Sequence, residues 1–464
     1  MSFLERIRPV KAAEADRLRA EYALRPPVRP DHLPVRDFHG ALAAGGGLIA
    51  EIKHRSPSNP TFRLDTPPGR MAAIYRRHGA AALSIVTDEA NFGTSLADVP
   101  SLHAAADLPV ITKDFIIDPV QVQAAWAAGA DAVLLIARML DGPLLEQLMA
   151  AVRSRGLDAL VECHDADDIA MAVAAGARLI GVNNRNLATL TTDLEYGGRL
   201  LPAIPANVVR ISESGLNTRA DILKMAALGA DAFLVGHALL LDRDPGRKVG
   251  ELCGRFAEHG TRVKVCGLTN AEDAAAADRA GADILGIIFA QSPRRIGLPQ
   301  AAAIRQALPA ARLCGVFMDQ DLTVVAAEAI EVGLDLIQLH GAESPAYCEE
   351  LAALTGLPLI KALRPAEAGA AFVEAYAAVA YFLVDLPKDR PADAAGAAAA
   401  ARAAALIGEH GREVFLAGAL TPANVAAAVA AATPYGVDVC GGVEKAKGIK
   451  HPDLVRQFIE ETRT

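Results

Sequence analysis

The sequence predicts an α/β protein built as two tandem (β/α)8 TIM barrels, the first with an N-terminal helical extension. Its 464 residues, 52% of them hydrophobic, suffice for two barrels of about 200–250 residues each. A glycine-centred phrase recurs along the chain. Two series of eight short apolar runs follow one another, and a helix-length segment separates each run from the next. Parallel strands joined by crossover helices are typical of this fold.

The recurring phrase is a small residue, a glycine and then an apolar run, as in AAGADAVLLIA at 127–137. Its glycines lie 47 to 53 residues apart, at Gly79, Gly129, Gly176, Gly229, Gly281 and Gly333. We interpret each copy as a helix that ends at a left-handed glycine and is followed at once by a buried strand. Each period is long enough for two βα units, which favours a periodic α/β architecture.

A charged helix over about 2–24 and a proline-rich stretch as far as Pro34 precede the first strand. The first eight strands are predicted at 48–52, within 78–86, at 109–112, within 127–137, at 158–162, within 174–184, at 207–212 and within 227–237. The second eight are predicted at 262–266, 283–289, 312–317, 335–340, 358–363, 379–385, 413–418 and 436–440. We therefore expect domains at 1–258 and 261–464. The alternative fold, two doubly wound sheets, needs a glycine-rich dinucleotide turn after its first strand, and the sequence has none.

Composition excludes several classes of function. The net charge of −9 leaves no bulk positive charge for nucleic acid, and the charged N-terminus does not read as a signal peptide. The alanine-rich run at 394–406, interrupted by Arg402, predicts a helix rather than a membrane span. Six cysteines without CxxC or Cys/His spacing predict a reducing, cytoplasmic location without disulfides or zinc. No motif calls for a cofactor or metal, and the sequence is compatible with a monomer.

Charged residues lie at the carboxyl ends of the odd-numbered strands of the first barrel. Barrel enzymes have their active sites at the carboxyl ends of their strands. These charged residues are Glu51 with Lys53, then Lys113, Glu162 and Glu213. The first 260 residues hold 23 arginines but five lysines, and two of the five lie at these strand ends. Lysine can act as an acid and arginine cannot, so we predict chemical use of the ammonium groups. The alternative is a structural ion network that seals the barrel.

Glycines after the last two strands of this barrel suggest a phosphate site. Ser214 and Gly215 follow the seventh strand, and Gly236 with His237 follows the eighth. Loops at these positions, with a short helix N-terminus, bind phosphate in many barrels. Each glycine alone is equally compatible with an ordinary turn.

The motifs IAEIKHRSPS (49–58), TKDF (112–115), GVNNRNL (181–187), SESG (212–215) and LVG (234–236) resemble indole-3-glycerol phosphate synthase. The resemblance covers the leader helix and the whole first barrel. It implies ring closure of a carboxyphenylamino-deoxyribulose phosphate, with loss of CO2 and water. It also implies Lys113 as general acid, Lys53 as ligand of the substrate carboxylate, Glu162 as proton carrier in the dehydration and Glu51 as electrostatic partner. Asn183 and Ser214 would orient the substrate, and its two ends would lie against Ser56, Phe92, Arg185, Glu213, Gly215 and Gly236.

In the second barrel, Cys266 ends the first strand and Asp385 ends the sixth. A thiol and a carboxyl across a pocket are a workable base and acid for moving a proton between adjacent carbons. As the base, Cys266 should be partly exposed with a lowered pKa. Cysteine is also a common small core residue, so a structural role is the alternative.

The motifs KVCGLT (264–269), GADILGIIF (281–289), SPR (292–294), QLHG (338–341), ALTPANV (419–425) and GVDV (436–439) resemble phosphoribosylanthranilate isomerase. The resemblance covers 262–464 and implies an Amadori rearrangement that makes the substrate of the first barrel. By the same resemblance Cys266 is the base, Asp385 the acid and Arg294 the ligand of the anthranilate carboxylate. The remaining substrate-binding positions would be His340, Gly418, Gly441 and Gly442. Small phosphorylated anthranilate-sugars are thus the expected ligands of both barrels.

This second resemblance has departures on the phosphate and acid side. The family's glycine-rich turn after the acid reads Leu386-Pro387-Lys388-Asp389, and one glycine of the seventh-strand pair is Ala419. Ala419 fits there if its φ is negative. A non-catalytic scaffold barrel is therefore one alternative. A phosphate-sugar isomerase of histidine biosynthesis, expected to use two aspartates, and a nucleotide- or flavin-phosphate-binding barrel are the others.

Overall fold

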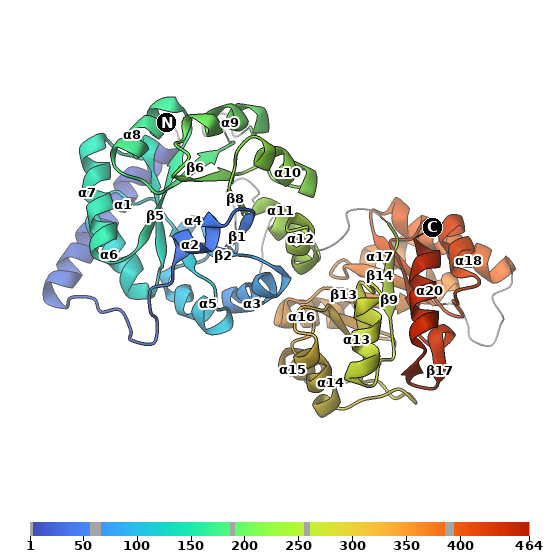
Figure 1. Cartoon of the computed structure of the whole chain (residues 1–464). Helices are drawn as coiled ribbons and strands as arrows, with labels where there is room; N and C mark the ends of the chain where they lie inside the picture. The colour runs from blue at the N-terminus through green and yellow to red at the C-terminus, as the bar shows by residue number, and fades with distance from the viewer. Residues whose placement is uncertain (1–2, 56–65, 186–190, 255–259, 386–393, 464) are drawn as a thin grey trace. The chain divides into compact units, whose positions relative to one another are not determined.

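The computed structural model describes residues 3–55, 66–185, 191–254, 260–385 and 394–463. The chain divides into two compact units, Met1–Phe256 and Ala257–Thr464. The sheet of each unit is a closed barrel of eight parallel strands (Figure 1). The prediction of two tandem (β/α)8 barrels is confirmed.

The first barrel runs in sequence order around its circumference. Its strands are β1 (Gly47–Ile52), β2 (Ala82–Val86), β3 (Val110–Lys113), β4 (Ala132–Ile136), β5 (Asp158–Cys163), β6 (Leu179–Asn183), β7 (Val209–Glu213) and β8 (Ala232–Val235). Its helices are α1 (Phe3–Leu24), α2 (Phe38–Ala43), α3 (Pro68–His78), α4 (Glu89–Phe92), α5 (Val99–Ala105), α6 (Pro119–Ala128), α7 (Gly142–Ser154), α8 (Ala166–Ala174), α9 (Leu194–Leu200), α10 (Arg219–Ala227), α11 (His237–Leu241) and α12 (Pro245–Leu252).

The second barrel repeats this order and closes β16 onto β9. Its strands are β9 (Arg262–Val265), β10 (Ile284–Ile288), β11 (Leu313–Phe317), β12 (Leu336–Leu339), β13 (Leu359–Leu363), β14 (Tyr381–Asp385), β15 (Glu413–Ala417) and β16 (Gly436–Val439). Its helices are α13 (Ala271–Arg279), α14 (Leu298–Ala307), α15 (Leu322–Val332), α16 (Pro345–Thr355), α17 (Ala370–Ala375), α18 (Ala394–Glu409), α19 (Val425–Ala432) and α20 (Pro452–Thr462). A short antiparallel pair, β17 (Glu444–Ala446) and β18 (Ile449–Lys450), follows β16.

The recurring phrase has the predicted conformation in both units. All six of its glycines have positive φ, from 71° at Gly333 to 110° at Gly79. The aspartate two residues further on has its own function at the bottom of the barrel. In four copies its carboxylate accepts a hydrogen bond, 2.8 to 2.9 Å long, from the N–H at or beside the start of the preceding strand. The four are Asp131, Asp231, Asp283 and Asp335. In these four copies the phrase thus turns the chain and links the start of the new strand to the preceding strand.

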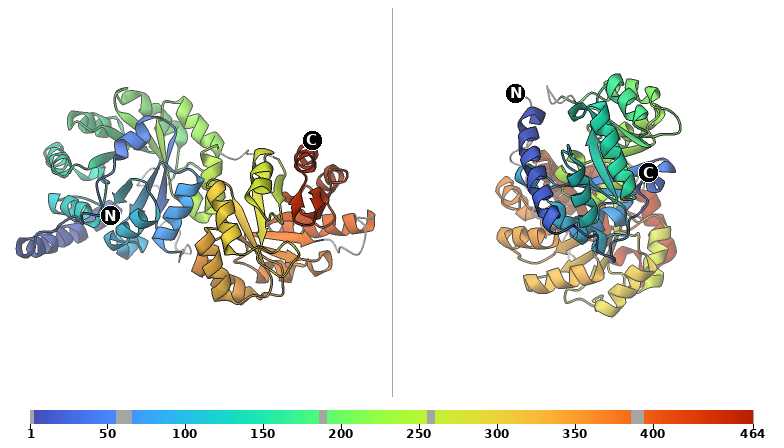
Figure 2. Two further views of the ribbon diagram at one scale, coloured as in Figure 1. Left: turned by 60° about the horizontal axis from the view of Figure 1, so that its bottom comes forward. Right: turned by 90° about the vertical axis from the view of Figure 1, so that its left-hand side faces the viewer.

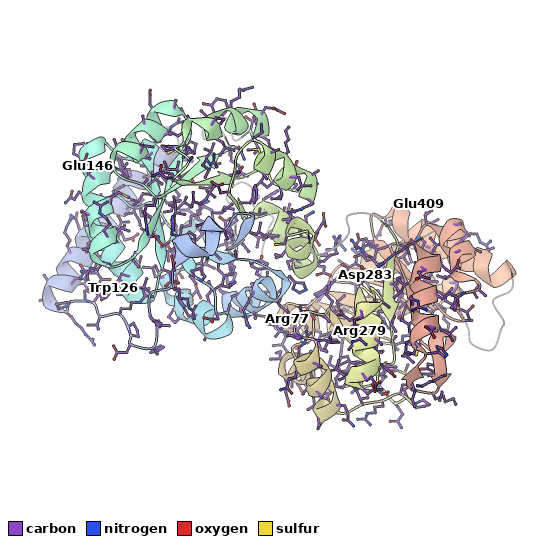
Figure 3. The ribbon with its side chains drawn as sticks, in the orientation of Figure 1. Arg77, Trp126, Glu146, Arg279, Asp283 and Glu409 are labelled. Carbon is purple, nitrogen blue, oxygen red and sulfur yellow. The ribbon has the colours of Figure 1, made fainter. Side chains whose placement is uncertain are left out.

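Asp283, labelled in Figure 3, also joins the ends of the second unit. Its carboxylate pairs with Arg262 at the start of β9 and with Arg463 just after α20, at 3.3 and 3.2 Å. The first β-strand and the last helix of this unit are therefore linked through one side chain.

The leader helix α1 packs on the outside of the first barrel against α6 (Figures 1 and 2). Ala15 and Leu18 of α1 form a buried cluster with Val120 and Ala124 of α6. Over the described residues, no helix is both long enough and apolar enough to cross a membrane.

Candidate active sites

In the first barrel, the ammonium of Lys113 lies among three carboxylates at the carboxyl ends of the strands. Its Nζ is 3.1 Å from Glu213, 3.5 Å from Glu51 and 4.0 Å from Glu162. Burial opposes the charge of Lys113, but the three carboxylates outweigh it and raise the pKa of this lysine. The structure therefore brings together four of the predicted residues, three carboxylates around the protonated amine of Lys113.

Glu51 is shared by the two lysines that the sequence singles out. Its Oε1 accepts a 2.5 Å hydrogen bond from Lys53, and its Oε2 faces Lys113. Burial alone would raise the pKa of Glu51, yet the two ammonium groups lower it to about 2. Glu51 is thus a fixed negative charge at any physiological pH.

Glu213 is the least solvated of the three acids. Its side chain is fully buried, and its Oε1 has no hydrogen-bond partner among the described residues. Burial is the main cause that raises the pKa of Glu213 to about 7, against the opposing effect of Lys113. A carboxyl with this pKa can exchange a proton near neutral pH, as general acid–base chemistry requires.

The raised pKa predicts that Glu213→Gln stabilises the first unit more at about pH 8.5 than at about pH 5. An unfolded glutamate ionises near pH 4.3. The pKa of Glu213 in the folded protein is higher. The stability that Glu213 contributes is therefore fully present below about pH 4.3 and is lost as pH rises through about 7. Glutamine does not ionise, so it avoids the cost of burying a charged carboxylate at high pH. Thermal unfolding of both proteins at the two pH values measures the difference.

The matched control is Glu146→Gln, since Glu146 is an exposed residue of α7 (Figure 3). It should show no pH-dependent gain. If Glu213→Gln stabilised the protein equally at both pH values, the raised pKa of Glu213 would be contradicted.

Asn183, Ser214 and Gly215 lie on β6 and on the turn after β7. The Oδ1 of Asn183 accepts from the backbone N–H of Arg185 at 3.0 Å, which fixes the start of that loop. Ser214 and Gly215 both have positive φ, 67° and 75°. A serine in the left-handed region is strained, and such strain is concentrated at functional sites.

Sequence reasoning missed Asn184, which holds this strained turn. Its Nδ2 donates to Ser212 Oγ at 3.0 Å and to the carbonyl of Ser214 at 2.9 Å. The motif GVNNRNL contains two adjacent asparagines, and the resemblance assigns a role to the first alone. Strand alternation was the available indication that they face different partners.

His164 was also missed, although it follows the fifth strand directly. Its ring is buried, and its Nε2 lies 3.4 Å from Glu162. Burial, and after it Arg138, lower the pKa of His164, so the ring is neutral at pH 7.

Gly236 and Gly181 make room for the acids. A Cβ on Gly236 would lie 2.2 Å from Glu51 Oε1, and a Cβ on Gly181 would lie 2.1 Å from Glu213 Oε1. Gly286 on β10 has the same relation to the thiol of Cys266, at 2.7 Å. Glu51, Glu213 and Cys266 thus each occupy space that a glycine of the neighbouring strand leaves free. Gly181 and Gly286 lie within that strand, and Gly236 directly follows it.

The predicted residue Phe92 lies at the end of α4. The carbonyl of Phe92 accepts from the N–H groups of His54 and Arg55, at 3.0 and 2.8 Å, which places α4 beside the end of β1. Ser56 lies outside the described residues, as does the turn from Leu386 to Asp389.

In the second barrel, Cys266 is buried, with 5% of its surface exposed. Burial raises the pKa of its thiol to about 12, although Lys264 acts in the opposite direction. The prediction of a partly exposed thiol with a lowered pKa is wrong, because burial removes water from around the thiol and disfavours its charged form. Lys264 lies two residues earlier, fully buried, and pairs with Asp438 at 3.0 Å. Sequence reasoning missed this ion pair below the thiol.

Asp385 is held by a short polar chain. The Nε2 of His340 lies 3.2 Å from Asp385 Oδ2, and the Nδ1 of His340 lies 3.1 Å from the amide of Gln338. His340 was predicted to bind substrate. The structure places it as the partner of the acid.

Arg294 makes a bidentate pair with Glu444 of β17, at 2.7 Å for each contact. The carboxylate of Glu444 also accepts from Lys450 at 3.1 Å. The guanidinium predicted to bind a substrate carboxylate therefore already holds a protein carboxylate.

The glycine loops of the second barrel touch one another. A Cβ on Gly442 would lie 1.9 Å from the carbonyl of Leu420, so the loops after β15 and β16 need a glycine to pack this closely. Gly441 lies on the Arg294 side. Gly418 and Ala419 have φ of 88° and 51°. Ala419 is thus in the left-handed region, not at the negative φ that would suit alanine, at a cost of about 1–2 kcal/mol.

The chain matches known families over both barrels. The family model "Indole-3-glycerol phosphate synthase" matches residues 4–252, and the model "N-(5'phosphoribosyl)anthranilate (PRA) isomerase" matches residues 263–461. A "Tryptophan biosynthesis protein TrpCF" from Yersinia pestis is 34% identical over 92% of this chain and 87% of its own length. One from Salmonella typhi is 38% identical over 68% of each chain. An "Indole-3-glycerol phosphate synthase" from Parafrankia sp. (strain EAN1pec) is 46% identical over 47% of this chain and 81% of its own.

Two closed barrels, each matched by the family model of a different enzyme, define a bifunctional barrel enzyme. The chain belongs to the family of tryptophan-biosynthesis enzymes that join an indole-3-glycerol phosphate synthase to a phosphoribosylanthranilate isomerase. It is a decarboxylating lyase and an isomerase. A scaffold role for the second barrel is not favoured.

Proposed function

We propose that the described clusters are the two reaction centres and that both take phosphorylated anthranilate-sugars. The second barrel converts phosphoribosylanthranilate into carboxyphenylamino-deoxyribulose phosphate. The first barrel converts that product into indole-3-glycerol phosphate, CO2 and water. The observation that carries the synthase assignment is the single ammonium of Lys113 within 4.0 Å of three carboxylates.

In the synthase reaction, Lys113 donates a proton to the carbonyl oxygen as the aromatic carbon attacks the carbonyl carbon. Lys53 binds the substrate carboxylate, which leaves as CO2. Glu162 then takes part in the proton transfer that expels the former carbonyl oxygen as water, and Glu51 balances the two ammonium charges. A buried, preorganised charge set favours such steps because it need not reorient during the reaction. Asn183 and Ser214 orient the substrate, and Gly215 is among the residues that line its anthranilate and phosphate ends.

In the isomerase reaction, Asp385 gives a proton to the ring oxygen of the ribose, and the ring opens to an iminium ion. Cys266 removes the proton from the adjacent carbon, and tautomerisation of the resulting enamine gives the ketone. The iminium cation favours the thiolate when it forms next to Cys266, which offsets the high pKa of the free thiol. His340 keeps the carboxyl of Asp385 in place, and Arg294 binds the substrate carboxylate by exchange with Glu444.

The direct test is to supply purified full-length protein with phosphoribosylanthranilate and to follow both products. Accumulation of carboxyphenylamino-deoxyribulose phosphate followed by indole-3-glycerol phosphate is expected. A chain that acts on only one of the two substrates would contradict the proposal for the other barrel.

We also propose that the domains are 1–258 and 261–464 and that each folds alone. Each unit has its own closed barrel and its own buried core, which is the physical requirement for an independent domain. Residues 1–258 expressed alone should be soluble and retain synthase turnover within about threefold. Circular dichroism and a synthase assay measure this. An inactive or aggregated fragment, with active full-length protein, would show dependence on the second unit.

A further inference from the structure

Lys11, in the leader helix, is a buried lysine that the reaction scheme leaves unused. It is 3% exposed, and it is one of the five lysines of the first 260 residues. Its Nζ lies 2.6 Å from Asp114 and 2.9 Å from Glu14. Burying an ammonium group costs free energy unless a carboxylate pairs with it. The ion pair with Asp114 therefore accounts for a lysine at this buried position.

Asp114 directly follows Lys113 and fixes the backbone around it. One of its carboxylate oxygens accepts from Thr87 Oγ1 at 2.8 Å, and the other accepts from the N–H of Phe115 at 2.7 Å. The N–H of Thr87 in turn donates to the carbonyl of Lys113 at 3.0 Å. The backbone at Lys113 is therefore held by Thr87, which also binds the carboxylate of Asp114. Lys11 binds that same carboxylate.

The leader helix holds the same loop at its far end. Arg19 of α1 bonds to Asp118, and Asp118 caps α6 by accepting from the N–H of Val120 at 2.9 Å. Lys11 and Arg19 lie on the helix face that also carries Ala15 and Leu18. The segment from Asp114 to Asp118 is thus fixed at both ends by α1.

We propose that Lys11 is a positioning residue of the synthase: by binding Asp114, it keeps the ammonium of Lys113 among Glu51, Glu162 and Glu213. The inference rests on the proposed role of Lys113. Without Lys11, the carboxylate of Asp114 loses its cation and becomes free to attract the neighbouring ammonium away from the cluster. A displacement of about 1 Å can reduce turnover about 10²-fold.

The test compares Lys11→Met and Lys11→Arg in the full-length protein, below the unfolding temperature of each. Methionine keeps the bulk of the chain and removes the charge. Lys11→Met should lower the synthase kcat about 10- to 100-fold with KM changed less than about threefold. Lys11→Arg keeps the charge and should retain kcat within about threefold. Isomerase turnover in the same samples should not change, because it belongs to the other unit. Lys224→Met, at a 44% exposed side chain, is the matched control.

A double variant separates this inference from the role of Lys113. Because Lys11 acts through Lys113, adding Lys11→Met to Lys113→Ala should cause little further loss. An equal loss in both backgrounds would show that Lys11 acts elsewhere. A normal kcat for Lys11→Met with only a lower unfolding temperature would overturn the proposal and leave a structural pair. Near-normal turnover of Lys113→Ala would instead contradict the role of Lys113 itself.

Discussion

Lys113→Ala is expected to lower synthase turnover about 10²–10⁴-fold, the usual contribution of general acid catalysis. Ring closure places negative charge on the carbonyl oxygen, and Lys113 is the ammonium that lies among all three acids. Alanine also leaves three buried carboxylates with one fewer cation, so a loss of stability is expected as well. Synthase assays with saturating carboxyphenylamino-deoxyribulose phosphate measure the effect on kcat.

Isomerase activity of the same variant is the internal control and should be unchanged. Lys224→Ala, which removes an exposed lysine that pairs with Glu195, should leave both activities unchanged. A Lys113→Ala protein that folds and turns over at a near-normal rate would remove this lysine from the mechanism.

Cys266→Ser is expected to lower isomerase turnover about 10²-fold or more. Serine keeps the size of the side chain, but a hydroxyl is a much weaker acid than a thiol and forms no useful base in the same pocket. Burial already raises the pKa of the thiol to about 12, so little reserve exists for a less acidic group. The matched control is Cys348→Ser, which makes the same exchange at a buried position on α16.

Asp385→Asn should cause a comparable loss, because an amide cannot give a proton to the ring oxygen. Asp453→Asn, at an exposed aspartate of α20, is its control. Synthase activity should survive all of these changes. Substantial isomerase turnover in Cys266→Ser would return Cys266 to the status of a small core residue.

The fold was predictable because its determinants are local. A left-handed glycine, an aspartate and an apolar run specify one turn and one strand each time they occur, and Asp131 and Asp283 make the same contact in different units. The convergence of Glu51, Lys113, Glu162 and Glu213 was predictable for a related reason. In a closed parallel barrel, residues at the carboxyl ends of strands meet at one rim.

What the sequence did not predict depends on neighbours distant along the chain. The burial of Cys266, the left-handed φ of Ala419 and the occupation of Arg294 by Glu444 follow from tertiary packing. The link from Lys11 to Asp114 spans the leader helix and the third strand, and no local pattern contains both residues. Asn184 and His164 were missed because their neighbours Asn183 and Glu162 better fitted the expected chemistry.

The glycines that accommodate Glu51, Glu213 and Cys266 bear on how such enzymes diverge. Glycine to alanine is among the smallest changes open to a gene, yet at Gly236, Gly181 or Gly286 it would displace a reactive group without altering it. These three glycines should therefore be as strongly conserved as the two glutamates and the cysteine that they accommodate. Among descendants, a change at such a glycine should be accompanied by loss or replacement of the group beside it.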